Sequence, residues 1–111
     1  MISFLFWNVY DRHLEDRVAR LAVARNVDVV MLAESATSPV QMLEALNRDG
    51  DRRYTYPFTE GDRIQIFTRF PESSLIDFFN SPLNRLTIRR LRVRPTLDIL
   101  LCVLHFQSRT N

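Results

Sequence analysis

Lysine is absent from this chain of 111 residues, so all fifteen basic side chains are arginines. Glycine occurs only at Gly50 and Gly61, which excludes a glycine-rich loop that wraps a phosphate. No apolar run approaches the ~20 residues that a helix needs to span a bilayer. The net charge of +2 is too small to indicate a nucleic-acid partner by itself.

Cysteine is nearly absent as well. The single Cys102 lies inside an apolar run, has no partner for a disulfide, and is expected to have a packing role. This usage indicates a reducing compartment, and we expect the cytoplasm. The N-terminus lacks a basic segment and a small-residue cleavage site, so it is interpreted as a buried strand rather than a signal peptide.

Five arginines are clustered late in the chain without an acidic residue between them: Arg85, Arg89, Arg90, Arg92 and Arg94. Arginine binds phosphate with two parallel hydrogen bonds, so the cluster is compatible with a phosphate-facing strip. The alternative is that alternating arginines protect an edge strand against aggregation. The sequence favours the second interpretation.

Hydrophobic periodicity predicts a strand at 2–7, a helix at 14–26 and a buried strand at 29–33. Ser38 and Pro39 then start a second helix, which Gly50 closes. Further strands are expected at 53–58, 63–68, 75–79, 86–93 and 97–104, the last of them central. This order predicts an α/β domain with one mixed sheet of about six strands and two helices on one face.

Three of the apolar strands are each followed by a polar residue: Asn8, Glu34 and His105. Ligand sites in open α/β sheets gather at the carboxyl ends of strands, so these side chains are candidates for one shared site. Glutamate and histidine at strand ends are also common as solvated turn or capping residues. Spacing alone favours that second interpretation.

The chain resembles the endonuclease/exonuclease/phosphatase superfamily, metal-dependent phosphodiesterases related to pancreatic deoxyribonuclease. The matching segments are Phe6-Trp7-Asn8, residues 28–34, residues 63–69 and residues 103–109, in the family's order. The resemblance covers nearly the whole chain. It implies half of a four-layer α/β sandwich, with residues 1–111 as a partial, N-terminal half of the domain.

The resemblance also implies roles for the polar residues. Glu34 would bind the catalytic Mg²⁺, or Mn²⁺ in its place, since Mg²⁺ needs only one or two carboxylates beside water and substrate phosphate. Asn8 would lie near the metal and the phosphate, and His105 would bind or protonate the phosphoryl group. Asp62 would assist the histidine, although an aspartate after Gly61 is also ordinary turn chemistry. The substrate would be a phosphate ester of nucleic acid, inositol phosphate or phospholipid.

Two motifs of the family, Gly-Asp-x-Asn and Ser-Asp-His, do not occur in the 111 residues. We therefore expect a fragment of a Mg²⁺-dependent phosphodiesterase or phosphatase that is inactive alone. The sheet face with Ile99, Leu101 and Val103, or the residues between them, should lie open to water. The chain should then self-associate or bind a C-terminal half. The alternative function is a non-catalytic remnant or interaction module that uses this face.

Overall fold

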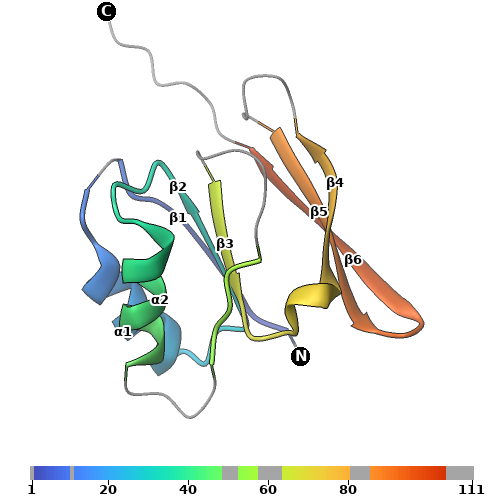
Figure 1. Ribbon diagram of the computed structural model, residues 1–111, viewed down its shortest axis with the longest axis horizontal. Coiled ribbons are helices and arrows are strands. Elements are labelled where there is room, and N and C mark those ends of the chain that lie inside the picture. Colours follow the sequence, from blue (N-terminus) through green and yellow to red (C-terminus); the bar gives the residue numbers. More distant parts are fainter. Residues whose placement is uncertain (1, 11, 49–52, 58–63, 81–85, 105–111) are drawn as a thin grey trace, which may run out of the picture.

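The computed structural model describes residues 2–10, 12–48, 53–57, 64–80 and 86–104 (Figure 1). These ranges contain two α-helices and six strands, which confirms the predicted α/β class. Neither helix is long and apolar enough to cross a membrane. In chain order the elements are β1 (Phe4–Asn8), α1 (Glu15–Ala24), β2 (Val29–Ala33), α2 (Pro39–Asn47), β3 (Ile64–Thr68), the 3₁₀ turn η1 (Glu72–Ser74), β4 (Leu75–Asn80), β5 (Leu86–Arg94) and β6 (Leu97–Leu104).

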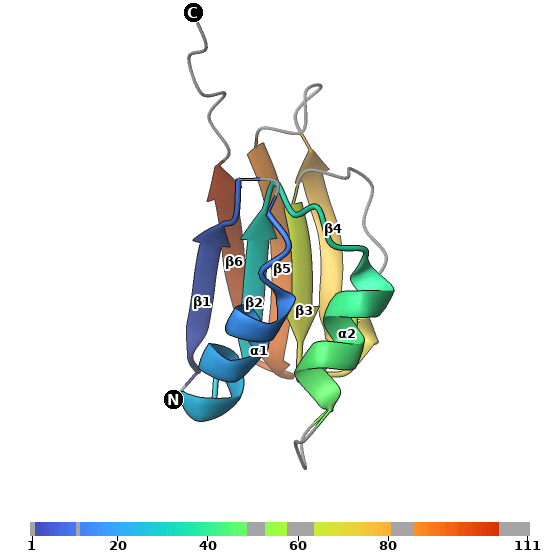
Figure 2. The same cartoon turned by 90° about the vertical axis from the view of Figure 1, so that its left-hand side faces the viewer.

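The six strands lie in two sheets of three, which corrects the prediction of a single sheet. Sheet A has the order β1-β2-β3, with β1 and β2 parallel and β3 antiparallel; sheet B has the antiparallel order β4-β5-β6. Pro71 and η1 interrupt the chain between β3 and β4, so β4 starts a new sheet instead of extending sheet A. Figure 2 shows sheet B behind sheet A, on the side away from the helices.

The central strand of sheet A, β2, is buried on both faces, as its five apolar residues predicted. On one face, Val30, Leu32 and Phe67 pack against α1 and α2. On the other face, residues of sheet A and sheet B form a second core: Val29, Met31, Ile64, Ile66, Leu75, Leu91 and Leu101. The described part of the chain is therefore a three-layer sandwich of helices, sheet A and sheet B (Figures 1 and 2).

α1 ends and α2 begins where the sequence predicted, for local reasons. α2 itself ends at Asn47, and Gly50, which was expected to close it, lies outside the described residues. After α1, Asn26 takes a left-handed backbone conformation with φ 55°. Its N–H donates to the carbonyl of Val23, and the Val27 N–H donates to the carbonyl of Ala22, the pattern of a Schellman cap. At α2, the Ser38 side chain accepts from the backbone N–H of Gln41 in a capping box, with proline in the first turn.

Three predictions about strands are corrected. β6 is an edge strand, and β5 lies in the centre of sheet B. Cys102 is exposed rather than packed in the core, because it lies on the outer face of β6 while its neighbour Leu101 faces sheet A. In 53–58, the described residues 53–57 form only an isolated bridge between Thr55 and Thr68.

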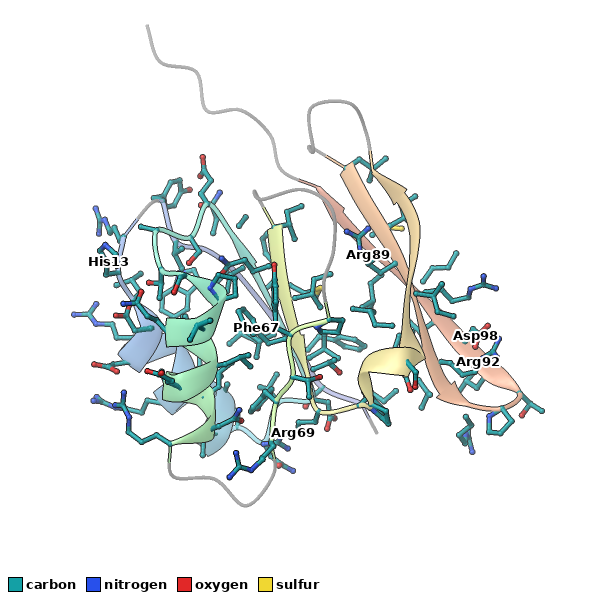
Figure 3. All side chains as sticks on the ribbon, viewed as in Figure 1. His13, Phe67, Arg69, Arg89, Arg92 and Asp98 are labelled. Atoms are coloured by element: carbon teal, nitrogen blue, oxygen red, sulfur yellow. The ribbon has the colours of Figure 1, made fainter. Side chains whose placement is uncertain are left out.

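The arginine cluster is divided between the two faces of β5. Arg89 faces sheet A and is buried at 1% exposure, whereas Arg92 lies on the opposite face with Asp98 (Figure 3). The Arg92 Nε atom donates to Asp98 Oδ1 over 3.0 Å, and this bond lowers the pKa of Asp98 below its ordinary value. The arginines of β5 therefore do not form one continuous phosphate-facing strip. The protection of an edge strand, which the sequence favoured, is wrong as well, because β5 is the central strand of sheet B. Arg85 lies outside the described residues.

Candidate active site

Asn8 and Glu34 lie at neighbouring ends of two parallel strands. Asn8 is the last residue of β1, its partner in β2 is Ala33, and Glu34 follows Ala33 directly. The Val9 N–H donates to the Ala33 carbonyl over 3.0 Å, so the two chains stay paired up to this edge. The structure thus brings both predicted site residues to one rim of sheet A.

The backbone at this rim is strained. Glu34 has φ 53° and Tyr10 has φ 51°, both in the left-handed region. For residues other than glycine this conformation costs roughly 1–2 kcal/mol. The Asn8 Oδ1 atom accepts a hydrogen bond of 3.0 Å from the Tyr10 N–H, which holds one of the two turns. Strain of this kind concentrates at functional sites, so it favours a functional interpretation of the rim.

A polar cluster is centred on Thr37 in the loop that carries Glu34, and we call it the Thr37 clasp. Its centre, Thr37, is 2% exposed, and its Oγ1 donates to Glu15 Oε2 over 2.8 Å. Its backbone carbonyl accepts from Gln65 Nε2 over 3.2 Å, and its N–H donates to Ser35 Oγ over 3.2 Å. The clasp therefore ties the loop after β2 to both α1 and β3.

Glu15 carries the negative charge of the Thr37 clasp. Its pKa lies below the ordinary value because of a hydrogen bond from its own backbone N–H at the start of α1 and a second one from the Thr37 hydroxyl. His13 adds a smaller electrostatic contribution, and its Nδ1 atom lies 3.4 Å from Thr37 Oγ1. His13 itself is exposed, in the loop before α1 (Figure 3).

Sequence reasoning missed the clasp. Glu15 lies in the segment predicted as the first helix and Gln65 in the strand predicted at 63–68, and neither position by itself indicates a contact with Thr37. Thr37 lies in a small polar segment before a helix cap, which carries no signal of burial. Only the proximity of Glu15, Thr37 and Gln65 in the folded chain identifies these residues as one unit.

The other two predicted site residues, Asp62 and His105, lie outside the described residues. Their assignment stays a prediction. β3 begins at Ile64, whose partner is Ala33, so the start of β3 lies at the same edge as Asn8 and Glu34.

The donor atoms at the rim suit a hard divalent cation. Glu34 provides a carboxylate and Asn8 an amide oxygen, and Mg²⁺ binds through one or two such ligands with water in the remaining positions. No group of three or more histidine, cysteine or acidic side chains that would hold a metal occurs among the residues described. A metal ion at this rim would thus be held by few ligands from the protein.

Two hollows in the described surface lie away from this rim. One, of about 440 Å³, is between α1 and α2 and includes Asp16 and Arg48. The other, of about 370 Å³, is lined by Asp28, Arg53, Arg69 and Phe70 at the opposite end of sheet A. Neither hollow is lined by Asn8 or Glu34, so the shape of the described surface does not by itself identify the candidate site.

Comparison with known proteins gives a match in fold only. No family model and no curated protein sequence matches the chain. Among solved structures, an endonuclease/exonuclease/phosphatase family protein from Leptotrichia buccalis C-1013-b is similar, with a TM-score of 0.66 and 16% identity over 96% of this chain and 54% of that chain. The endonuclease domain of TRAS1, a telomere-specific non-LTR retrotransposon, has a TM-score of 0.55 and 17% identity over 96% of this chain and 45% of that chain. The chain thus spans about half the length of these structures, and the resemblance predicted from the sequence is confirmed as a resemblance of fold.

Proposed function

We propose that this chain, which has the fold of roughly half of an endonuclease/exonuclease/phosphatase domain, is part of a metal-dependent phosphoric ester hydrolase. The observation that carries the proposal is the pairing of strand ends that brings Asn8 beside Glu34. The strained backbone at Glu34 and the Thr37 clasp in the same loop support the same assignment.

In this proposal Glu34 holds a Mg²⁺ or Mn²⁺ ion. When bound, the ion supplies positive charge beside the phosphate that is attacked. Asn8 orients the phosphate through its amide, and Glu15 and Thr37 keep the Glu34 turn in place. His105 is the candidate proton donor, because an ordinary histidine pKa of ~6.5 is close to working pH. Asp62 would orient His105.

Nucleic acid is the substrate class that we favour, because one of the similar structures is an endonuclease domain. In the family that the chain resembles, the base that activates water belongs to the Gly-Asp-x-Asn and Ser-Asp-His motifs, which do not occur in these 111 residues. We therefore propose that the chain alone does not cleave its substrate. Plasmid DNA incubated with the chain and Mg²⁺ should be nicked no faster than with Mg²⁺ alone.

The metal assignment can be tested on the chain as it is. Mn²⁺ binding, followed by water proton relaxation, should be lost or weakened at least about tenfold in Glu34→Gln, since one carboxylate carries the charge of the site. Glu44→Gln is the matched control, because Glu44 is an exposed carboxylate on α2. Equal Mn²⁺ affinity in Glu34→Gln and the unmodified chain would contradict the assignment.

A non-catalytic interaction module is the second candidate. Mn²⁺ binding that depends on Glu34 would exclude it, whereas a chain that binds no Mn²⁺ but associates with a partner would support it.

A further inference from the structure

A second hollow lies at the end of sheet A opposite the candidate active site, and the proposed function does not use it. Its volume is about 370 Å³, and we call it the Arg69 hollow; it is lined by Asp28, Arg53, Arg69 and Phe70. β3 ends at Thr68, whose partner Val29 is the first residue of β2, and Figure 3 shows Arg69 at this end of the sheet. The length of β2 separates the hollow from Glu34 by roughly 16 Å along the strand.

The Arg69 hollow has more positive than negative charge, because it contains two arginines and one aspartate. The Asp28 carboxylate is engaged at the start of β1, where its Oδ2 atom accepts from the Ser3 N–H over 3.0 Å and from the Ser3 hydroxyl over 3.4 Å. Within the described ranges, neither Arg53 nor Arg69 forms an ion pair with a carboxylate. The positive charge of the hollow is therefore only partly offset.

The guanidinium group of Arg69 is held in one orientation by its contacts. Its Cζ atom lies 5.0 Å from the centre of the Tyr54 ring, and its Nη1 atom donates to Asn26 Oδ1 over 2.6 Å. The backbone N–H of Arg69 donates to the Asp28 carbonyl over 3.0 Å. A guanidinium group that lies over an aromatic ring keeps its N–H groups at the edge of its plane, where they can bind an anion.

Tyr54, on which Arg69 lies, is itself fixed in the core. It is 2% exposed, and its hydroxyl donates to the Val27 carbonyl. Its backbone N–H and C=O pair with the side-chain amide of Asn47 over 2.7 and 3.0 Å. Because the ring below Arg69 is fixed, little conformational freedom is lost when a ligand binds to this guanidinium group.

One donor of Arg69 has no acceptor in the part of the chain that the structure describes. The Nε atom is buried and makes no hydrogen bond there. A buried donor without an acceptor destabilises the fold, and a ligand oxygen would remove this cost. Since Nη1 is bound to Asn26, Nε and Nη2 form the edge that suits two oxygens of one anion.

We propose that the Arg69 hollow binds a phosphate group, either as inorganic phosphate or as the phosphate of a nucleic-acid backbone. Two phosphate oxygens accept from Nε and Nη2 of Arg69, and Arg53 pairs with a third oxygen. Phosphate suits the hollow because its oxygens point in several directions and can reach both guanidinium groups. This inference does not depend on the proposed function, because neither Asn8 nor Glu34 lines the hollow.

A titration with inorganic phosphate, followed by NMR at constant ionic strength, tests the site. EDTA in the buffer excludes any contribution from a metal at Glu34. The Nε–H signal of Arg69, assigned by its loss in Arg69→Lys, should shift as phosphate is added. Arg53→Gln and Arg69→Gln should each raise the phosphate dissociation constant by about tenfold or more, because each removes a charge-assisted hydrogen bond.

Arg48→Gln is the matched control. Arg48 lines the hollow between α1 and α2 and lies 3.5 Å from the Asp16 carboxylate, so the same loss of charge there should leave phosphate binding unchanged. Circular dichroism checks that each variant folds. If Arg69→Gln does not fold, Arg53→Gln still tests the site, because Arg53 is exposed.

A short single-stranded oligonucleotide distinguishes the two sources of phosphate. An oligonucleotide that binds the chain and loses affinity in Arg53→Gln would support a site for nucleic-acid backbone. Binding of inorganic phosphate alone would support a site for free phosphate. The inference would be overturned if phosphate left the Arg69 Nε–H signal unshifted, or if Arg53→Gln and Arg48→Gln bound phosphate with equal affinity.

Discussion

The Thr37 hydroxyl donates to the Glu15 carboxylate over 2.8 Å, and this bond links the turn after β2 to the first turn of α1. The turn carries Glu34 in a left-handed conformation, so the contact stabilises a strained backbone next to the candidate metal ligand.

Thr37→Val should lower the free energy of unfolding by about 1–3 kcal/mol, because it removes the donor and leaves a half-buried carboxylate and a buried loop poorly satisfied. Thr37→Ser keeps the hydroxyl and should retain most of that stability. Urea denaturation of the two variants provides the measurement. Equal stability of Val and Ser at this position would show that the clasp is not held by the hydroxyl.

The stabilising effect of Glu15 should depend on pH. Its pKa in the folded chain is below the ordinary value of 4.5, so its charged form favours folding at any pH above 4.5. This contribution is lost as the pH falls below 4.5 toward the folded pKa. Glu15→Gln should therefore be less stable than the unmodified chain at neutral pH, and the difference should shrink below pH 4.5. Urea denaturation in a series of buffers measures it, and a difference that grows toward acid pH would refute it.

Glycine at position 34 should be better tolerated than alanine. Both substitutions remove the carboxylate, but only glycine adopts φ 53° without steric conflict, so Glu34→Gly should exceed Glu34→Ala in stability by about 1 kcal/mol. Thermal unfolding compares the two. Neither should bind Mn²⁺ through this position, which separates backbone strain from metal binding.

Packing between the sheets is tested on β5 and β6. Leu91 is fully buried in the core between the sheets, and Leu91→Ala should lower the unfolding free energy by about 2–5 kcal/mol. Leu100 is 56% exposed on the outer face of the same sheet. Leu100→Ala should therefore change the free energy of unfolding by at most about 0.5 kcal/mol. Similar losses for both would contradict the assignment of inner and outer faces.

The local features of the chain were predicted from its sequence because neighbouring residues decide them. Five apolar residues predicted that β2 is buried on both faces, and Ser38 with Pro39 predicted the start of α2. The positions of Asn8 and Glu34 after apolar strands predicted that they share an edge. A resemblance of fold followed from the order of these segments.

Contacts between segments far apart in the chain could not be predicted from the sequence. Alternation along β6 separates Leu101 from Cys102, but it does not say which of the two faces another layer; the packing of sheet B on sheet A decides that. The burial of Arg89 has the same origin, since its strand presents arginines to both sides.

The sequence by itself determined the class of fold, the end of α1, the start of α2 and the order in which polar residues follow the strands, because short-range periodicity and capping chemistry fix these. Only the tertiary structure decided that the six described strands divide into two sheets, that β2 is the central strand of sheet A, and that Thr37 joins Glu15 and Gln65. The physical reason is that backbone pairing and burial are made between residues far apart in the chain, and local pattern specifies a face but not what covers it.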